Sequence, residues 1–332
     1  MLGIALLGSG RMAHVYGPKI AAHPEMALVA IYNPRIASAE KATALYGGVA
    51  SDDLAKVLAD DRVDAVVIAT PTDTHFEYIE ACAKAGKPIY CEKPLDMTLE
   101  RTDRCLEALA AHPVPFMLGF NRRFDPQIAQ LRQAVAAGEL GALRFLQSTS
   151  REPAPPPISY VESSGGYFVD AQIHDIDLMC WIAGERPAEV YAQGACLVDP
   201  AIGEAGDVDT AMTILTFTSG AMAWINNCRA CAYGFDQRIE VFGEKGLLQT
   251  VNRRDDDLIR WDATRTEARQ PLKHFFLERY DESFGLALEE FFAALAEGRA
   301  PSSGQTDGRD ALAIALACER SRRERRAVAP AY

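Results

Sequence analysis

The sequence predicts an α/β protein with two domains: a doubly wound parallel sheet in residues 1–120, and an α+β domain with a large, mostly antiparallel open sheet in residues 121–332. The length supports this, because 332 residues exceed the size at which one hydrophobic core usually stops growing. Short apolar strands alternate with helical segments up to Phe120, as in parallel sheets. Beyond Phe120, helices and several strand-like runs follow at the spacing of an antiparallel sheet.

The composition is that of an ordinary globular protein, with 48% hydrophobic and 24% charged residues. The formal net charge of -12 argues against nucleic acid, since phosphate binding needs a concentrated cationic face. No apolar run approaches the ~20 residues of a membrane helix, and no signal peptide is expected. Eight cysteines without a compact framework favour a reducing compartment. We therefore expect a cytoplasmic protein that binds neither nucleic acid, nor membrane, nor metal.

A glycine loop after the first strand indicates dinucleotide binding. Gly8 allows the tight turn, Gly10 lets backbone N–H groups approach a pyrophosphate, and Ala13 permits close helix–sheet packing. The amino end of the following helix favours the anion. This pattern is the fingerprint of a Rossmann domain. The expected cofactor contacts in the loop are Gly8, Ser9, Gly10, Arg11 and Met12.

The ribose of the cofactor is expected at the end of the second strand, where Asn33 stands. An acid here would accept hydrogen bonds from the 2′-hydroxyl and repel a 2′-phosphate, whereas Asn33 keeps only the hydrogen-bonding group. Arg35 then becomes a partner for the 2′-phosphate. The alternative is that Asn33 and Pro34 form a turn and that Arg35 is solvated. We expect NAD as the cofactor, with NADP open.

Two further strands end in polar loops, at the edge where parallel sheets bind ligands. The strand at residues 65–69 leads into the loop 70–75, in which we expect His75 to cap the next helix and not to act as a base. The strand at residues 88–91 leads into Glu92-Lys93-Pro94, where Lys93 either faces the crevice or belongs to an exposed turn. The expected cofactor contacts in these loops are Thr70, Pro71, Thr72, His75, Glu92 and Lys93.

Asp170 and His174 are four residues apart in an expected helix, which places both side chains on one face. An imidazole beside a carboxylate titrates near neutral pH and is held in one tautomer, as a general base for an alcohol requires. Structural pairs of this kind are commoner than catalytic ones. The rest of the chain therefore decides between the two interpretations.

With the glycine loop, Glu92-Lys93-Pro94 and Asp170-x-x-x-His174 in this order, the chain resembles the glucose-fructose oxidoreductase/inositol dehydrogenase/rhizopine catabolism (Gfo/Idh/MocA) family over nearly its whole length. Within the family it is most similar to members that oxidise inositol, through motifs at residues 119–126, 150–153, 173–177, 206–209 and 233–238.

The resemblance implies NAD(P)-dependent oxidation of a ring hydroxyl of a cyclic polyol, with myo-inositol to 2-keto-myo-inositol preferred. Lys93 would hydrogen-bond the reacting oxygen, His174 would take its proton, and Asp170 would orient His174 and touch the substrate. The substrate contacts that the resemblance implies are Lys93, Asn121, Arg122, Glu152, Asp170, His174, Tyr233 and Phe235.

Other functions remain open. Relatives often carry tyrosine at the position of Phe235 and aspartate or asparagine at that of Glu152, so another inositol isomer, an aldose or a sugar acid is an alternative substrate. A non-catalytic dinucleotide sensor, or chemistry that recycles a bound cofactor, would use the same fold. The outer face of the second sheet is apolar enough to predict a homo-oligomer, a dimer or tetramer.

Overall fold

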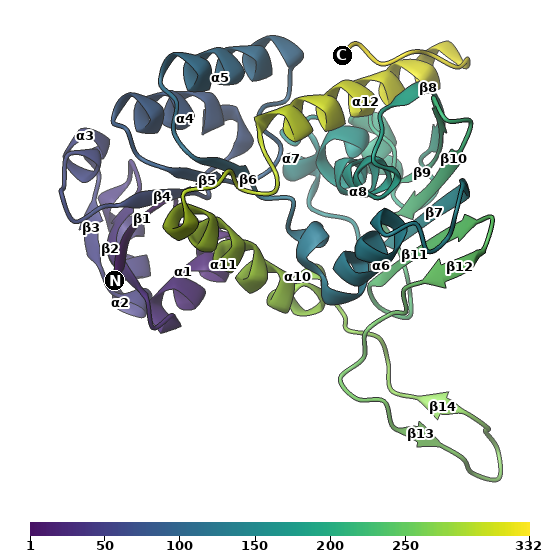
Figure 1. Cartoon of the computed structure of the whole chain (residues 1–332). Helices are drawn as coiled ribbons and strands as arrows, with labels where there is room; N and C mark the ends of the chain where they lie inside the picture. The colour runs from purple at the N-terminus through teal and green to yellow at the C-terminus, as the bar shows by residue number, and fades with distance from the viewer. The chain divides into compact units, whose positions relative to one another are not determined.

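The chain folds into two units, each built around its own sheet (Figure 1). The structure, a computed structural model, describes residues 1–332. The first unit comprises residues 1–121 and 283–312, and the second comprises residues 122–282 and 313–332.

The first unit holds a six-stranded sheet in the order β3-β2-β1-β4-β5-β6, with every neighbouring pair parallel. This is the doubly wound order, whose switch point lies between β1 and β4. The strands are β1 (Leu2–Leu7), β2 (Met26–Tyr32), β3 (Val49–Ser51), β4 (Ala65–Ile68), β5 (Ile89–Cys91) and β6 (Phe116–Leu118). The helices are α1 (Ala13–Ala22), α2 (Ile36–Tyr46), α3 (Leu54–Leu58), η1 (Thr72–Thr74), α4 (His75–Lys84) and α5 (Leu99–Ala111).

Residues 283–312 pack with the first unit, although the sequence assigned everything after Phe120 to the second domain. The reason is aromatic packing and hydrogen bonding to the edge strand β6. On α11 (Asp281–Glu297), Phe284 meets the ring of Tyr16 at 6.0 Å between centroids. Ser303 and Leu118 of β6 exchange two hydrogen bonds, one between their backbones and one from Ser303 Oγ. The last helix, α12 (Gln305–Glu324), begins in the first unit and ends in the second.

The second unit holds a six-stranded sheet in the order β12-β11-β7-β10-β9-β8. Only β7 and β10 run parallel, so the predicted mostly antiparallel sheet is confirmed. The strands are β7 (Leu143–Arg151), β8 (Pro187–Ala195), β9 (Thr210–Phe217), β10 (Met222–Cys228), β11 (Asp236–Gly243) and β12 (Gly246–Gln249). The helices are η2 (Asn121–Phe124), α6 (Pro126–Ala136), α7 (Ile158–Val161), η3 (Phe168–Gln172), α8 (Ile173–Ala183), α9 (Pro200–Glu204) and α10 (Phe276–Arg279).

Side chains alternate along β10: Ala223 and Ile225 are buried, whereas Met222 and Trp224 are exposed on the outer face. Beyond β12, an arm formed by residues 251–274 extends away from the sheet and carries the short hairpin of β13 (Ile259–Arg260) and β14 (Ala268–Arg269) (Figure 1). None of the helices combines the length and the hydrophobicity needed to cross a bilayer.

Candidate active site

The glycine loop lies between β1 and α1, where its two glycines have different surroundings. Gly8 has a positive φ of 105°, and a Cβ there would stand 2.5 Å from the carbonyl oxygen of Ala69. Only glycine therefore fits that turn. A Cβ on Gly10 would meet nothing within 4 Å. The packing of the chain thus does not require glycine at position 10, which leaves this backbone open to a ligand.

Asn33 joins the end of β2 to the glycine loop. Its Nδ2 donates to Ser9 Oγ at 2.8 Å, and its Oδ1 accepts from the backbone N–H of Arg35 at 2.9 Å. The turn at Asn33 and Pro34 is therefore formed, and the Arg35 side chain is exposed. Both oxygen and nitrogen of the Asn33 amide are engaged within the chain.

His75 connects two loops at the carboxyl ends of β4 and β5. Its ring nitrogens lie 2.8 Å from the Pro94 carbonyl oxygen and 3.1 Å from that of Thr70. The ring is buried, and this burial lowers the pKa of His75. The prediction that His75 caps the following helix is wrong, because the ring faces carbonyl oxygens and not the free N–H groups of α4. It ties together the loops that hold Thr70 and Lys93.

Glu92, which precedes Lys93 in the chain, is buried. Its carboxylate accepts from the hydroxyl of Tyr16 on α1 and, at 3.2 Å, from the backbone N–H of Lys93. The hydroxyls of Tyr16 and Tyr90 lie 3.1 Å apart. Burial raises the pKa of Glu92. The carboxylate therefore orients the backbone of Lys93, and nothing in the sequence pointed to Tyr16 as its partner.

Asp170 and His174 lie on consecutive helical turns, but the helix is not α-helical throughout. Asp170 belongs to the π-helical turn η3 (Phe168–Gln172), and His174 lies in α8. The expectation of a single α-helix is corrected here, since the wider π turn precedes α8. Such turns occur frequently at functional sites. Both side chains are half-buried.

Both carboxylate oxygens of Asp170 are engaged. Arg229 Nη2 donates to Oδ2 at 3.0 Å, and the hydroxyl of Tyr160 on α7 donates to Oδ1 at 2.8 Å. Arg229 Nη1 donates in addition to Glu152 Oε2 at 3.3 Å. Arg229 thus bridges two of the expected substrate contacts. Sequence reasoning missed Arg229 and Tyr160, which no motif marks.

Arg122 belongs to a buried polar network under α8. Its Nη1 donates to Asp175 Oδ1 at 3.2 Å and to Gln237 Oε1 at 2.8 Å. Asp175 also accepts from Ser148 Oγ at 2.6 Å and from Asn227 Nδ2 at 2.9 Å. A buried carboxylate with this many donors has its hydrogen-bonding capacity satisfied, and it fixes α8 on the sheet.

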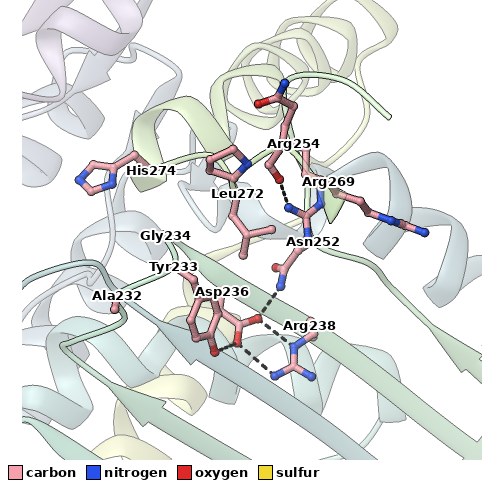
Figure 2. A pocket seen from close by; sticks show the side chains of 12 residues that line it. Ala232, Tyr233, Gly234, Asp236, Arg238, Asn252, Arg254, Arg269, Leu272 and His274 are labelled. Carbon is pink, nitrogen blue, oxygen red and sulfur yellow. Dashed lines mark hydrogen bonds and ion pairs between the residues drawn. The ribbon is translucent and has the colours of Figure 1, made fainter. Parts of the chain in front are cut away.

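Two of the expected substrate contacts have different surroundings. Phe235 is 2% exposed and packs edge-on against the ring of Tyr280 at 5.9 Å. The hydroxyl of Tyr233 accepts from Arg151 at 2.8 Å and donates to Asp236 at 2.9 Å. A cavity of about 730 Å³ lies at the base of the arm. Tyr233 and Asp236 line it (Figure 2), together with Arg238, Asn252, Arg254, Arg269 and His274.

The expected site residues are divided between the two units. Lys93 and Asn121 belong to the first, where Asn121 Nδ2 donates to Ser283 Oγ at 3.1 Å. Arg122, Glu152, Asp170 and His174 belong to the second. Within the second unit, Arg229 joins Asp170 to Glu152, and Asp175 holds Arg122.

The strand order and the glycine loop at its switch point define a dinucleotide-binding protein of the Rossmann type. Residues 2–120 match the model of an oxidoreductase family with an NAD-binding Rossmann fold, and residues 128–249 match the GFO/IDH/MocA C-terminal domain. The chain belongs to the Gfo/Idh/MocA family of oxidoreductases. The predicted family, fold and NAD cofactor are confirmed.

Relatives cover almost the entire chain. The inositol 2-dehydrogenase of Rhizobium meliloti (strain 1021) is 42% identical over 97% of both chains. The myo-inositol 2-dehydrogenase of Thermotoga maritima is 40% identical, over 98% of this chain and 97% of that one. The solved myo-inositol dehydrogenase of Corynebacterium glutamicum has a TM-score of 0.95 at 39% identity over both full chains. The scyllo-inositol dehydrogenase of Lactobacillus casei, solved with NAD(H) and scyllo-inositol, has a TM-score of 0.91 at 26% identity over 99% of both chains.

Proposed function

We propose that the protein oxidises myo-inositol to 2-keto-myo-inositol with NAD as the hydride acceptor. The observation that carries this proposal is the 40–42% identity, over nearly the full length, to two inositol 2-dehydrogenases. The reaction removes a hydride from the carbinol carbon and a proton from its oxygen. Bound NAD supplies the hydride acceptor.

We assign the proton chemistry to Lys93 and His174. Lys93 hydrogen-bonds the reacting oxygen and stabilises the developing alkoxide, and His174 accepts its proton. Asp170 orients His174 and accepts a hydrogen bond from a substrate hydroxyl. The residues that contact the polyol ring are Asn121, Arg122, Glu152, Tyr233 and Phe235. Supporting these roles, Glu92 and Asp175 fix the backbones that carry Lys93 and His174.

The glycine loop and the loops after β4 and β5 contact the cofactor. The residues that face the pyrophosphate are Gly8, Ser9, Gly10, Arg11 and Met12. The ribose is faced by Asn33 and Arg35. The contacts on the nicotinamide side of the cofactor are Thr70, Pro71, Thr72, His75, Glu92 and Lys93. The amide of Asn33 is held by Ser9 and by the backbone of Arg35 at the strand end where the ribose is expected.

The test is a panel of inositols, aldoses and sugar acids, with reduced nicotinamide followed by its absorbance. We expect the highest kcat/KM on myo-inositol. A higher value on scyllo-inositol or on glucose would reject the proposed substrate. Lys93→Met and His174→Ala should each lower kcat by about 10²- to 10⁴-fold while NAD still binds. Unchanged rates would reject the roles of Lys93 and His174, and no turnover of any member of the panel by the wild type would favour the non-catalytic sensor.

We also propose that the protein forms a cytoplasmic homo-oligomer, a dimer or tetramer. Its outer sheet face exposes a group of large apolar side chains, and a second copy would cover this face. They are Phe145, Tyr191, Met212, Ile214, Met222, Trp224 and Leu247. All eight cysteines are free thiols, which suits a reducing compartment.

A further inference from the structure

Arg229 lies where two neighbouring parallel strands end. β7 and β10 form the single parallel pair of the second sheet, in which Cys228 pairs with Arg151. The residues that follow these two strands are Arg229 and Glu152, and the backbone N–H of Glu152 donates to the Cys228 carbonyl at 3.0 Å. The pairing therefore brings the guanidinium of Arg229 to the carboxylate of Glu152.

The guanidinium is almost fully enclosed. The Arg229 side chain is 3% exposed, and its guanidinium lies 4.9 Å from the ring centre of Tyr167. Burial lowers the pKa of Arg229, but the charges of Glu152 and Asp170 outweigh this and raise it. Its Nε is buried and has no hydrogen-bond partner within the chain. A buried cation with one unsatisfied donor is costly to stability, which favours a functional reason for keeping it.

The charges around Arg229 do not cancel. One guanidinium faces two carboxylates, those of Asp170 and Glu152, so the cluster of these three residues carries one net negative charge. The nearby charge of Arg122 is matched by Asp175. A carboxylate is only an acceptor, but each of its oxygens has two lone pairs, so Asp170 and Glu152 can also accept hydrogen bonds from a ligand. A polyol supplies hydroxyl donors, whereas an ionised sugar acid brings a third negative charge.

We propose that Arg229 is a positioning residue that fixes Asp170 and Glu152 as acceptors for substrate hydroxyls, and that this negatively charged cluster selects neutral polyols against sugar acids. This inference rests on the proposed function, because it names the substrate class of the same site. Tyr160 also positions Asp170, since its hydroxyl donates a hydrogen bond to the second carboxylate oxygen.

The positioning role is tested by the pH profile of kcat/KM for myo-inositol. The groups that face Asp170 include Arg229, Tyr160 and, through Arg229, Glu152, with His174 on the next helical turn. Arg229→Met removes the cation that favours ionised carboxylates. The acid limb of the profile, where kcat/KM falls as pH decreases, should therefore move to higher pH by about one unit. Arg229→Lys should restore the limb but keep a raised KM, because lysine cannot bind both carboxylates with one planar fork.

A matched control and a second variant guard against simple unfolding. Arg132→Met removes a half-buried arginine that lies near the Trp181 ring, and it should leave the pH limb unmoved. Tyr160→Phe removes one hydroxyl from an exposed side chain of α7 without emptying the core, and it should shift the acid limb in the same direction by less. An unmoved limb in both Tyr160→Phe and folded Arg229→Met would overturn the positioning role.

Selectivity is tested by calorimetric binding of myo-inositol and glucuronate to the NAD-loaded protein, alongside turnover. The wild type should bind inositol at least tenfold more tightly than glucuronate, and Glu152→Gln should narrow this ratio about tenfold. Equal binding of the two ligands by the wild type would overturn the inference. If the wild type binds inositol selectively but turns over no polyol, the proposed function fails and the inference stands.

Discussion

Asn33 stands where an acid would set a strict preference for NAD. Its amide bonds Ser9 and the backbone of Arg35, so a carboxylate of similar shape fits the same place. Asn33→Asp should lower kcat/KM for NADP at least tenfold, because the carboxylate repels the 2′-phosphate, and should change that for NAD much less. Steady-state kinetics with both cofactors measure this ratio. Equal loss for both cofactors would contradict the assignment of Asn33 to the ribose.

Glu92 shows how burial changes a single group. Its pKa is raised in the folded chain, so the folded state holds a proton that the unfolded state has released above pH ~4.3. The free energy of unfolding is therefore reduced as pH rises from this value towards the raised pKa. The Glu92→Gln variant does not lose unfolding free energy in this way, since an amide does not ionise.

We accordingly expect the unfolding free energy of Glu92→Gln, relative to that of the wild type, to increase as pH rises from 4 to 7. Urea unfolding at several pH values measures it. Glu100→Gln, on the exposed first turn of α5, is the control and should show no such trend. A difference independent of pH would contradict the raised pKa of Glu92.

The segment from β1 to α1 shows that two glycines of one motif act through different physics. Gly8→Ala places a Cβ against the Ala69 carbonyl at a positive φ, so it should destabilise the chain by about 1–3 kcal/mol. Gly10→Ala meets open space, so it should leave the melting temperature unchanged and weaken NAD binding about tenfold or more.

Thermal unfolding without ligand and calorimetric titration with NAD separate these two effects. A Gly10→Ala variant that binds NAD as the wild type does would remove Gly10 from the cofactor site. A Gly8→Ala variant with unchanged stability would show that the turn can relax.

The helix of Asp170 and His174 illustrates the limit of periodicity. A spacing of four residues predicted one helical face, but the pattern could not distinguish an α turn from the π turn at Phe168–Gln172. The wider turn depends on what packs around it, including the bond from Tyr167 N–H to Asp207 at 3.0 Å. Only the neighbours of a helix select such a turn.

Considered as a whole, the protein leaves a broad apolar surface uncovered on its second sheet. Trp224 and Met222 are 39% and 40% exposed there. Trp224→Lys combined with Met222→Lys should convert the proposed oligomer to a smaller species, because two desolvated cations would destabilise the interface. Light scattering after size exclusion measures the mass. Leu45→Lys, at an exposed position of α2, is the control and should leave the mass unchanged.

Local patterns predicted the alternation of strands and helices, the glycine loop, the change of architecture near Phe120 and the family. Each depends on residues close together in the chain, where periodicity and turn chemistry act directly. The strands expected at residues 65–69 and 88–91 correspond to β4 (Ala65–Ile68) and β5 (Ile89–Cys91) for the same reason.

Other features depended on residues far apart in the sequence. Arg229 meets Asp170 and Glu152 across 59 and 77 positions, and Tyr16 meets Glu92 across 76. Residues 283–312 return to the first unit through contacts with Tyr16 and Leu118. Such pairings arise only when strand order and helix packing bring distant segments together, and no pattern within a short window of sequence encodes them.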